Sequence, residues 1–238
     1  MGEMISMIAH QWRQPLAAIS STSIGLLIKL DLKSFDLKAQ EGRDAYEKYF
    51  ADKLRNINGY VHNLTTTIDD FRDFYKPNKE PVTMRLEDVI VKSLSIIEET
   101  LENDNIEIKK EYNSNELIRL YDNEMMQVIL NILKNASDNF KEKQIKDPYI
   151  KISTEHRKIS ICDNGGGISR DIKEKIFDPY FSTKSEKNGT GLGLYMSKTI
   201  VENHHNGILN IKNILKSGKV TGVCFTIEFP INGKKKVI

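Results

Sequence analysis

The sequence lacks the features that mark several specialised classes of protein. It has two cysteines in 238 residues, too few for a disulfide framework, and Cys162 and Cys224 do not have a zinc-site spacing. The apolar run at residues 24–28 is stopped by Lys29, far short of the roughly 18 residues that span a membrane. No basic, apolar and cleavable N-terminal signal is present. These absences exclude a collagen, a secreted disulfide scaffold and an integral membrane chain, and favour a reducing, cytoplasmic setting.

The chain also lacks an excess of charge of either sign. Lys and Arg number 35 and Asp and Glu number 33, which gives a net charge of +2. This balance argues against a main role in binding nucleic acid or an anionic membrane surface. Hydrophobic residues make up 39% of the chain and charged residues 29%. A core can therefore form, while some elements stay thin and exposed to solvent.

Residues 1–76 carry apolar side chains at alternating steps of three and four, which predicts two long helices. The first stripe begins at Ile5 and the second ends at Tyr75, on either side of a polar connection at residues 31–45. One narrow stripe per helix buries little apolar surface. We therefore expect two copies to pair as a four-helix bundle, so that residues 1–76 form a homodimerisation domain.

Two prolines mark a change of pattern after the second helix. Pro77 and Pro81 bracket a short charged stretch, and proline disfavours helical structure in the residue before it. We therefore place a linker at residues 77–81, a second domain at residues 82–233 and a tail at residues 234–238.

In the second domain, helix-like and strand-like segments follow each other without regular alternation. This pattern predicts an α+β sandwich. The expected strands are rich in β-branched residues. Helices are expected at residues 86–101, 122–143, 171–176 and 192–203, and strands around residues 106–108, 149–154, 158–162, 207–211 and 220–229.

One histidine lies away from the apolar stripe of the first helix. His10 is two residues from both Ile8 and Trp12, which at about 100° per residue turns it toward solvent. A lone histidine of this kind is most often an ordinary surface residue. However, Pro15 follows inside the same helix, where a proline costs about 3 kcal/mol. A proline at that position indicates a segment with a role beyond packing.

Five motifs, in this order, resemble those of bacterial sensor histidine kinases. The run HQWRQPL, which starts at His10, is similar to the phosphoacceptor box of the subgroup whose box reads His-x-Trp-Arg-Gln-Pro-Leu. Four further runs resemble the family's asparagine, first glycine, phenylalanine and second glycine boxes. They are NILKNA at residues 131–136, DNGGGI at 163–168, FDPYFSTK at 177–184 and GTGLGL at 189–194. A single short motif is weak, whereas five in order are specific.

The resemblance implies an ATP-dependent protein histidine kinase of a two-component system. Such an enzyme phosphorylates His10 and passes the phosphoryl group to an aspartate of a response-regulator receiver domain. The resemblance further implies a homodimer, a second domain of the GHKL (Bergerat) type, and ATP and Mg²⁺ as ligands. The catalytic core would lie in the cytoplasm, and an inner-membrane anchor in a sensor region outside this sequence is left open.

Elementary chemistry supports several of the implied site residues. Asn131 and Asn135 are four residues apart and point from one helix face. The resemblance implies that Asn135 gives Mg²⁺ its amide oxygen, a hard donor of the kind this ion prefers. An ionised Asp163 can accept a hydrogen bond from the adenine amino group. Asp138 is open between nucleotide contact and a solvated helix charge. The implied ATP-binding set is Asn131, Asn135, Asp138, Asp163, Gly165, Gly167, Ile168, Lys184, Gly189, Thr190, Gly191, Leu192, Gly193 and Leu194.

Two candidate catalytic residues depart from the family pattern. Gln11 follows His10 where many relatives have an acidic residue as base, and a glutamine amide cannot accept a proton. Gln14 stands where many relatives have Thr or Asn to orient water, so phosphatase activity is left open. Two alternatives also stay open: an ATP-binding dimeric signalling scaffold without kinase activity, and another ATPase of the same superfamily.

Two further pairs of residues receive ordinary structural interpretations. His204 and His205 are expected at a helix end before a glycine, where histidine is favourable, rather than in a metal site. Cys162 and Cys224 fall in expected strands and are interpreted as small buried apolar residues.

Overall fold

The computed structural model describes residues 2–75, 80–183 and 191–231, apart from the side chains of residues 2–11, 14, 63 and 66–75. The expected tail at residues 234–238 and most of the expected linker lie outside this description. The chain divides into two compact units, a helical unit and an α/β unit, which are considered separately below. None of the described helices combines the length and apolarity needed to cross a membrane.

The helical unit is a hairpin of two long helices, α1 (Gly2–Asp31) and α2 (Gln40–Tyr75). Helix α1 continues through Pro15. The connection is shorter than the expected 31–45, because local contacts let α2 begin at Gln40. The Arg43 guanidinium donates hydrogen bonds to the carbonyls of Leu37 and Lys38, at 3.1 and 3.0 Å. These bonds hold the first turn of α2 against the connection.

The α/β unit contains the remaining elements in an order that mixes helices and strands. They are β1 (Val82–Arg85), α3 (Leu86–Asn103), β2 (Glu107–Asn113), β3 (Leu117–Leu120), α4 (Asp122–Lys143), β4 (Tyr149–Glu155), β5 (Lys158–Asp163), α5 (Arg170–Lys175), α6 (Gly193–Thr199), a π-helical turn η1 (Ile200–His204), β6 (Ile208–Lys216) and β7 (Lys219–Glu228).

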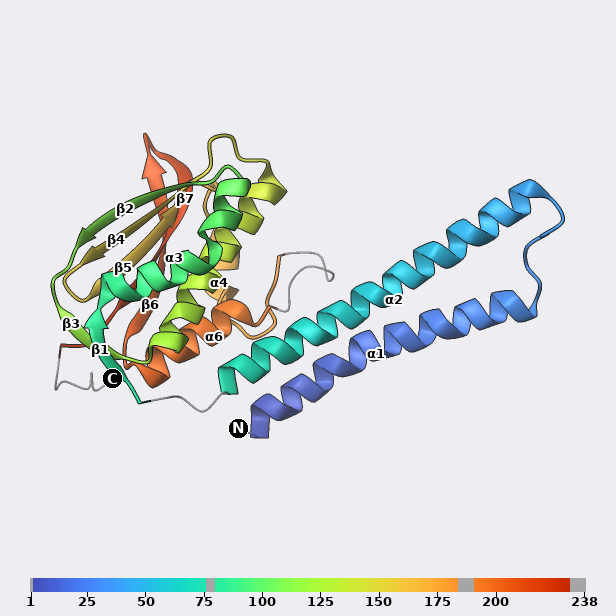
Figure 1. The fold of residues 1–238 in the computed structure, drawn as a ribbon, viewed down its shortest axis with the longest axis horizontal. Coiled ribbons are helices and arrows are strands. Elements are labelled where there is room, and N and C mark those ends of the chain that lie inside the picture. Colours follow the sequence, from blue (N-terminus) through green and yellow to red (C-terminus); the bar gives the residue numbers. More distant parts are fainter. Residues whose placement is uncertain (1, 76–79, 184–190, 232–238) are drawn as a thin grey trace. The chain divides into compact units, whose positions relative to one another are not determined.

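Five of the strands form one sheet in the order β2-β4-β5-β7-β6. The β2–β4 pair is parallel and the other neighbours are antiparallel. Helices α3, α4 and α6 lie on one face of this sheet (Figure 1). A sheet with helices on one face agrees with the expected α+β sandwich. Strands β1 and β3, which pair in a separate two-stranded sheet, were not expected.

Alternation along β5 decides which of its side chains meet the helices. Ile159 and Ile161 are buried, whereas Ser160 and Cys162 between them are only half-buried. Side chains two apart share a face of a strand, so Asp163, the last residue of β5, points to the same side as the two isoleucines. The Asp163 carboxylate therefore lies at the edge of the apolar core.

The interpretation of the cysteines as separate buried residues was wrong. Cys162 of β5 and Cys224 of β7 are directly opposite each other in the antiparallel register, and a disulfide joins them. Both are half-buried, on the sheet face that points away from the helices. The pairing depends on a register between strands that are 62 residues apart in sequence, which the cysteine count could not reveal.

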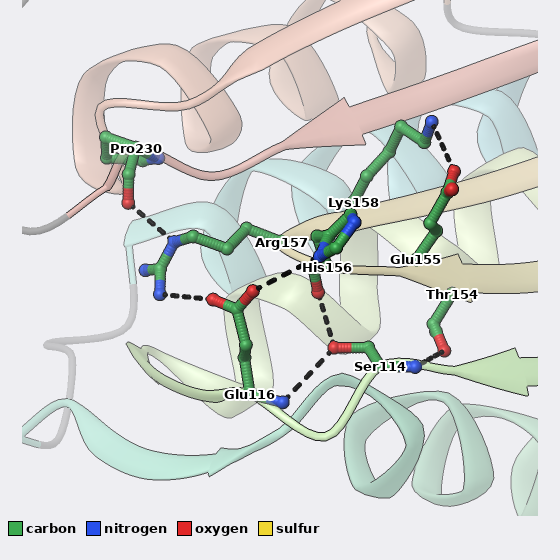
Figure 2. Close-up of polar contacts among 8 residues, drawn as sticks. All are labelled: Ser114, Glu116, Thr154, Glu155, His156, Arg157, Lys158 and Pro230. Atoms are coloured by element: carbon green, nitrogen blue, oxygen red, sulfur yellow. Dashed lines mark hydrogen bonds and ion pairs between the residues drawn. The ribbon is translucent and has the colours of Figure 1, made fainter.

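Polar contacts tie the end of β7 to two distant loops (Figure 2). The Arg157 guanidinium donates a hydrogen bond of 2.8 Å to the Pro230 carbonyl and lies 3.3 Å from a Glu116 carboxylate oxygen. The Ser114 hydroxyl donates to the His156 carbonyl. These contacts fix the β4–β5 turn against the loop that follows β2 and against the segment after β7.

Candidate functional site

A row of polar side chains runs along helix α4. Asn131, Asn135, Asn139 and Lys143 follow each other at steps of four, which places them on one face of the helix. Other positions of α4, such as Ile132 and Leu133, are buried in the core. The sequence identified Asn131 and Asn135. The same spacing, continued by two more steps, would have found Asn139 and Lys143.

The Asn131 side chain is held from two sides. Its amide nitrogen donates a 2.9 Å hydrogen bond to the Ser197 hydroxyl of α6, which donates at 2.9 Å to the Gly193 carbonyl. Its amide oxygen accepts a long 3.5 Å hydrogen bond from the Asn135 amide nitrogen. Because the Asn135 nitrogen turns toward Asn131, the Asn135 oxygen is directed elsewhere. Ser197 is a member of the site that sequence reasoning missed.

Asp163 is a buried carboxylate beside the first glycine run. Its Oδ1 accepts a 2.8 Å hydrogen bond from the Gly165 N–H. Burial raises the pKa of Asp163 above its ordinary value of 3.8. The Gly165 and Val223 N–H groups and the Lys143 ammonium oppose this increase. The ionised form of Asp163, which accepts hydrogen bonds, is therefore stabilised by these two N–H groups and the Lys143 ammonium.

The two predicted glycines of this run have different structural roles. Gly165 does not have a positive φ; a Cβ there would lie 2.1 Å from the Asn139 amide nitrogen, so a larger residue would displace the Asn139 side chain. Gly167 has a φ of +74°, and a Cβ there would lie 2.2 Å from a Val220 methyl group. Gly165 is therefore constrained by packing, and Gly167 is constrained both by packing and by a backbone conformation that glycine adopts readily.

Ile168, at the end of the run, is held by a side chain from a distant strand. The Asn213 amide of β6 accepts from the Ile168 N–H at 2.9 Å and donates to the Ile168 carbonyl at 2.7 Å. A side-chain amide can replace a backbone partner in this way because it has both a donor and an acceptor. Asn213 was not predicted, since nothing in its local sequence indicates the contact.

The second glycine run is only partly described. Lys184, Gly189 and Thr190 lie outside the described residues. Gly191 has a φ of +66°, and its carbonyl accepts a 2.9 Å hydrogen bond from the Tyr180 N–H of the phenylalanine box. The other described members are buried Leu192 and, at the start of α6, half-buried Gly193 and Leu194.

The remaining predicted site residues divide between the two units. Asp138 is half-buried on α4. His10, Gln11 and Gln14 lie within helix α1, and their side chains are outside the described part of the structure. Asn131, Asn135, Asp163, the first glycine run and residues Gly191–Leu194 of the second run thus belong to one unit, while the candidate phosphoacceptor belongs to the other.

The histidine pair contacts a buried carboxylate at the first turn of α4. His204 Nδ1 lies 3.0 Å and His205 Nδ1 lies 3.9 Å from Glu124 Oε2. His205 Nε2 accepts the Tyr121 N–H at 3.1 Å, and burial lowers the pKa of His205. No cluster of three or more His, Cys, Asp or Glu side chains in the described part of the chain is arranged to hold a metal ion.

Comparison with known proteins finds relatives of this chain in sequence and in fold. A domain family described as "Histidine kinase-, DNA gyrase B-, and HSP90-like ATPase" matches residues 121–233. The sensor histidine kinase ZraS of Salmonella typhimurium is 28% identical over 243 residues, which cover 99% of this chain and 47% of that protein. AtoS of Escherichia coli is 29% identical over 236 residues, covering 98% and 35%. The chain thus spans about half the length of these curated relatives, or less.

Solved structures agree with the matches in sequence. The catalytic domain of histidine kinase ThkA has a TM-score of 0.53 at 29% identity, and covers 64% of this chain and 96% of that domain. A longer ThkA chain, solved with the response regulator protein TrrA, has a TM-score of 0.60 at 23% identity and covers 96% and 61%. The second match shows likeness of fold alone.

The family match at residues 121–233 and the likeness to the ThkA catalytic domain show that the α/β unit has the fold of the histidine kinase-, DNA gyrase B- and HSP90-like ATPase domains. The matches to ZraS and AtoS extend over nearly the whole of this chain, so the chain is similar to a part of those sensor histidine kinases.

Proposed function

We propose that this chain is an ATP-dependent protein histidine kinase of a two-component system. The α/β unit binds ATP, His10 attacks the γ-phosphorus, and the phosphoryl group then passes to an aspartate of a response-regulator receiver domain. In the first step the bond between the γ-phosphorus and its bridging oxygen breaks, a bond to an imidazole nitrogen forms, and ADP leaves.

One observation carries the proposal. The buried Asp163 carboxylate is fixed by Gly165, and Gly165 is in turn bonded to the same α4 face that bears Asn131 and Asn135. Two kinds of group are therefore connected by hydrogen bonds. One is an acceptor suited to an adenine amino group, and the other is a pair of amides suited to a cation bound to phosphate. The 163–168 run and Gly191–Leu194 complete this predicted nucleotide site.

The residues present fit a magnesium ion. Asn135 would hold Mg²⁺ through its amide oxygen, since its nitrogen is turned toward Asn131. The bound ion would neutralise charge on the nucleotide phosphates. The chain's own contribution is to orient Asn135, through the chain of hydrogen bonds that runs from Asn131 to Ser197.

His10 is the proposed nucleophile. A histidine with an ordinary pKa near 6.5 is mostly neutral at pH 7, so it needs no base to generate a nucleophilic nitrogen. This is consistent with Gln11 at the neighbouring position, where a proton acceptor is absent. Transfer then depends chiefly on positioning, which is the usual situation in phosphoryl transfer.

A homodimer is the proposed assembly of the helical unit. Large apolar side chains on α1 and α2, among them Ile24, Leu27, Leu54 and Val61, are exposed in the single chain. A second copy would cover them in a four-helix bundle. The proposed domain limits are residues 1–76 for this unit, 82–233 for the ATP-binding unit and 77–81 for the linker.

The test is incubation of the pure chain with Mg²⁺ and γ-labelled ATP. We expect a protein-bound label that is stable in base, lost in acid and absent from His10→Ala. His62→Ala, on the exposed side of α2, is a matched control that should retain the label. The labelled protein should then lose its phosphoryl group to a receiver domain and not to a receiver domain without its acceptor aspartate.

Two outcomes would contradict the proposal. Label that persists in His10→Ala would remove His10 from its role. Binding of ATP with no label in the wild type would instead favour the dimeric scaffold without kinase activity.

A further inference from the structure

Helix α4 extends beyond the proposed metal-binding amides and makes two more contacts. The Asn139 amide nitrogen and the Lys143 ammonium each donate a hydrogen bond of 3.0 Å to the same acceptor, the Gly165 carbonyl. Neither residue belongs to the set implied by the sequence motifs. Both contact the peptide unit next to the one that holds Asp163.

We propose that Asn139 and Lys143 are positioning residues for adenine recognition, because they fix the Gly165 backbone, whose N–H sets the Asp163 carboxylate. This inference rests on the proposed binding of ATP. It assigns a role in base selection to a part of α4 that lies beyond Asn135.

The local sequence explains why the Gly165 backbone needs fixed hydrogen-bond partners. Gly165, Gly166 and Gly167 are consecutive, and glycine loses more conformational freedom on folding than any other residue. Gly166 and Gly167 have φ values of +85° and +74°. A run of this kind keeps one conformation only when its peptide groups have fixed partners. Asn139 and Lys143 supply these partners at Gly165, as Asn213 does at Ile168.

The packing at Gly165 shows how closely the loop meets the helix. A Cβ at Gly165 would lie 2.1 Å from the Asn139 amide nitrogen and 3.0 Å from Asp163 Oδ1. Helix, glycine and carboxylate therefore form one contiguous group. Movement of the Gly165 backbone would displace the N–H that orients Asp163.

Charge gives Lys143 a second effect that Asn139 does not share. Asp163 must be ionised to accept a hydrogen bond from the adenine amino group without competing as a donor. Burial raises the pKa of Asp163, and Lys143 from α4, Gly165 from the loop and Val223 from β7 lower it. Of these three, Lys143 is the charged one. Its removal should raise the pKa of Asp163 further, so that adenine binding is lost at a higher pH.

The experiment compares the affinities of the full chain for ADP and IDP, with Mg²⁺, by isothermal titration calorimetry. IDP has a carbonyl acceptor in place of the adenine amino group, so it has no donor at that position for Asp163, yet it has the same phosphates. Loss of a hydrogen bond to a charged group corresponds to about a tenfold to hundredfold change in affinity. We expect the wild type to prefer ADP by about that factor.

The variants are Lys143→Met, Lys143→Arg and Asn139→Ser. Lys143→Met and Asn139→Ser should lower the ADP affinity by about tenfold, with little change for IDP. Lys143→Arg should restore the preference. In Lys143→Met, ADP binding should fall away at a higher pH than in the wild type as pH is lowered. Lys141→Met is the matched control, since Lys141 pairs with Asp104 at 2.7 Å and should leave both affinities unchanged.

The outcomes distinguish this inference from the proposed function. If the wild type prefers ADP, and Lys143→Met and Asn139→Ser keep that preference, the positioning role of Asn139 and Lys143 is overturned. The proposed function would not be affected by that result. Equal losses for ADP and IDP would also overturn the positioning role, because they would indicate a general structural defect. A wild type that binds neither nucleotide would overturn the proposed function, and adenine recognition with it.

Discussion

The two units of the chain differ in how they shelter their apolar side chains. In the α/β unit, α3, α4 and the five-stranded sheet fully bury residues such as Leu86, Leu101 and Ile152. In the described part of the hairpin, Leu26 is the one large apolar side chain classed as buried. The α/β unit buries its apolar side chains within one chain, whereas the hairpin leaves an apolar stripe exposed that the proposed dimer would cover.

The first prediction tests whether the α/β unit unfolds independently of chain association. Leu101→Ala removes a fully buried side chain from α3 and should lower the free energy of unfolding of this unit by about 2–5 kcal/mol. Thermal unfolding should show one transition shifted by the mutation and independent of protein concentration. A second transition, from the hairpin, should rise with concentration. Two concentration-independent transitions would remove the difference between the units.

The second prediction concerns the cross-strand disulfide, which also makes the α/β unit self-sufficient. A bond that closes a loop of 62 residues should stabilise this unit by about 2–4 kcal/mol through restriction of the unfolded chain. Dithiothreitol, or the double change Cys162→Ser with Cys224→Ser, should lower only the concentration-independent transition. The double variant is the control for the reductant, since it should not respond to it. An unchanged midpoint in both experiments would show that the disulfide contributes nothing to stability.

The third prediction uses two exposed apolar side chains, one in each unit. Leu54 of α2 is 52% exposed and Val91 of α3 is 56% exposed. If a second copy covers the hairpin, Leu54→Glu places a carboxylate in the interface and should weaken dimerisation by about tenfold or more. Val91→Glu should leave it unchanged. Analytical ultracentrifugation over a range of concentrations measures both, and equal behaviour of the two variants would contradict the proposed dimer.

Sequence reasoning succeeded where the signal was local. The helix expected at 122–143 has those bounds, because its apolar period extends over six turns and polar residues follow it. The strands expected at 149–154 and 158–162 each extend one residue further. Their β-branched residues and the turn between them lie within a few positions of each other.

Sequence reasoning failed where a contact joins segments that are distant in the sequence. Strand register or loop placement determines three such contacts: the β1–β3 pair, the Cys162–Cys224 disulfide and the hydrogen bonds between Asn213 and Ile168. No period in the sequence encodes them. The contacts of Asn139 and Lys143 are intermediate: their spacing was visible, but their partner, Gly165, was not.

The smallest predicted effect concerns a hydrogen bond between two side chains of the α/β unit. Ser197→Ala removes the hydroxyl that holds the Asn131 amide and should lower stability by only about 1 kcal/mol. Because Asn131 orients Asn135, the variant should need a higher Mg²⁺ concentration to bind ADP half-maximally. Ser93→Ala is the matched control: Ser93 is equally buried in a helix and donates to the Val89 carbonyl at 2.8 Å, but lies on α3. A similar loss of stability with no shift in Mg²⁺ dependence is expected there. If Ser197→Ala behaves like Ser93→Ala in both measurements, Ser197 stabilises α6 without positioning the amides.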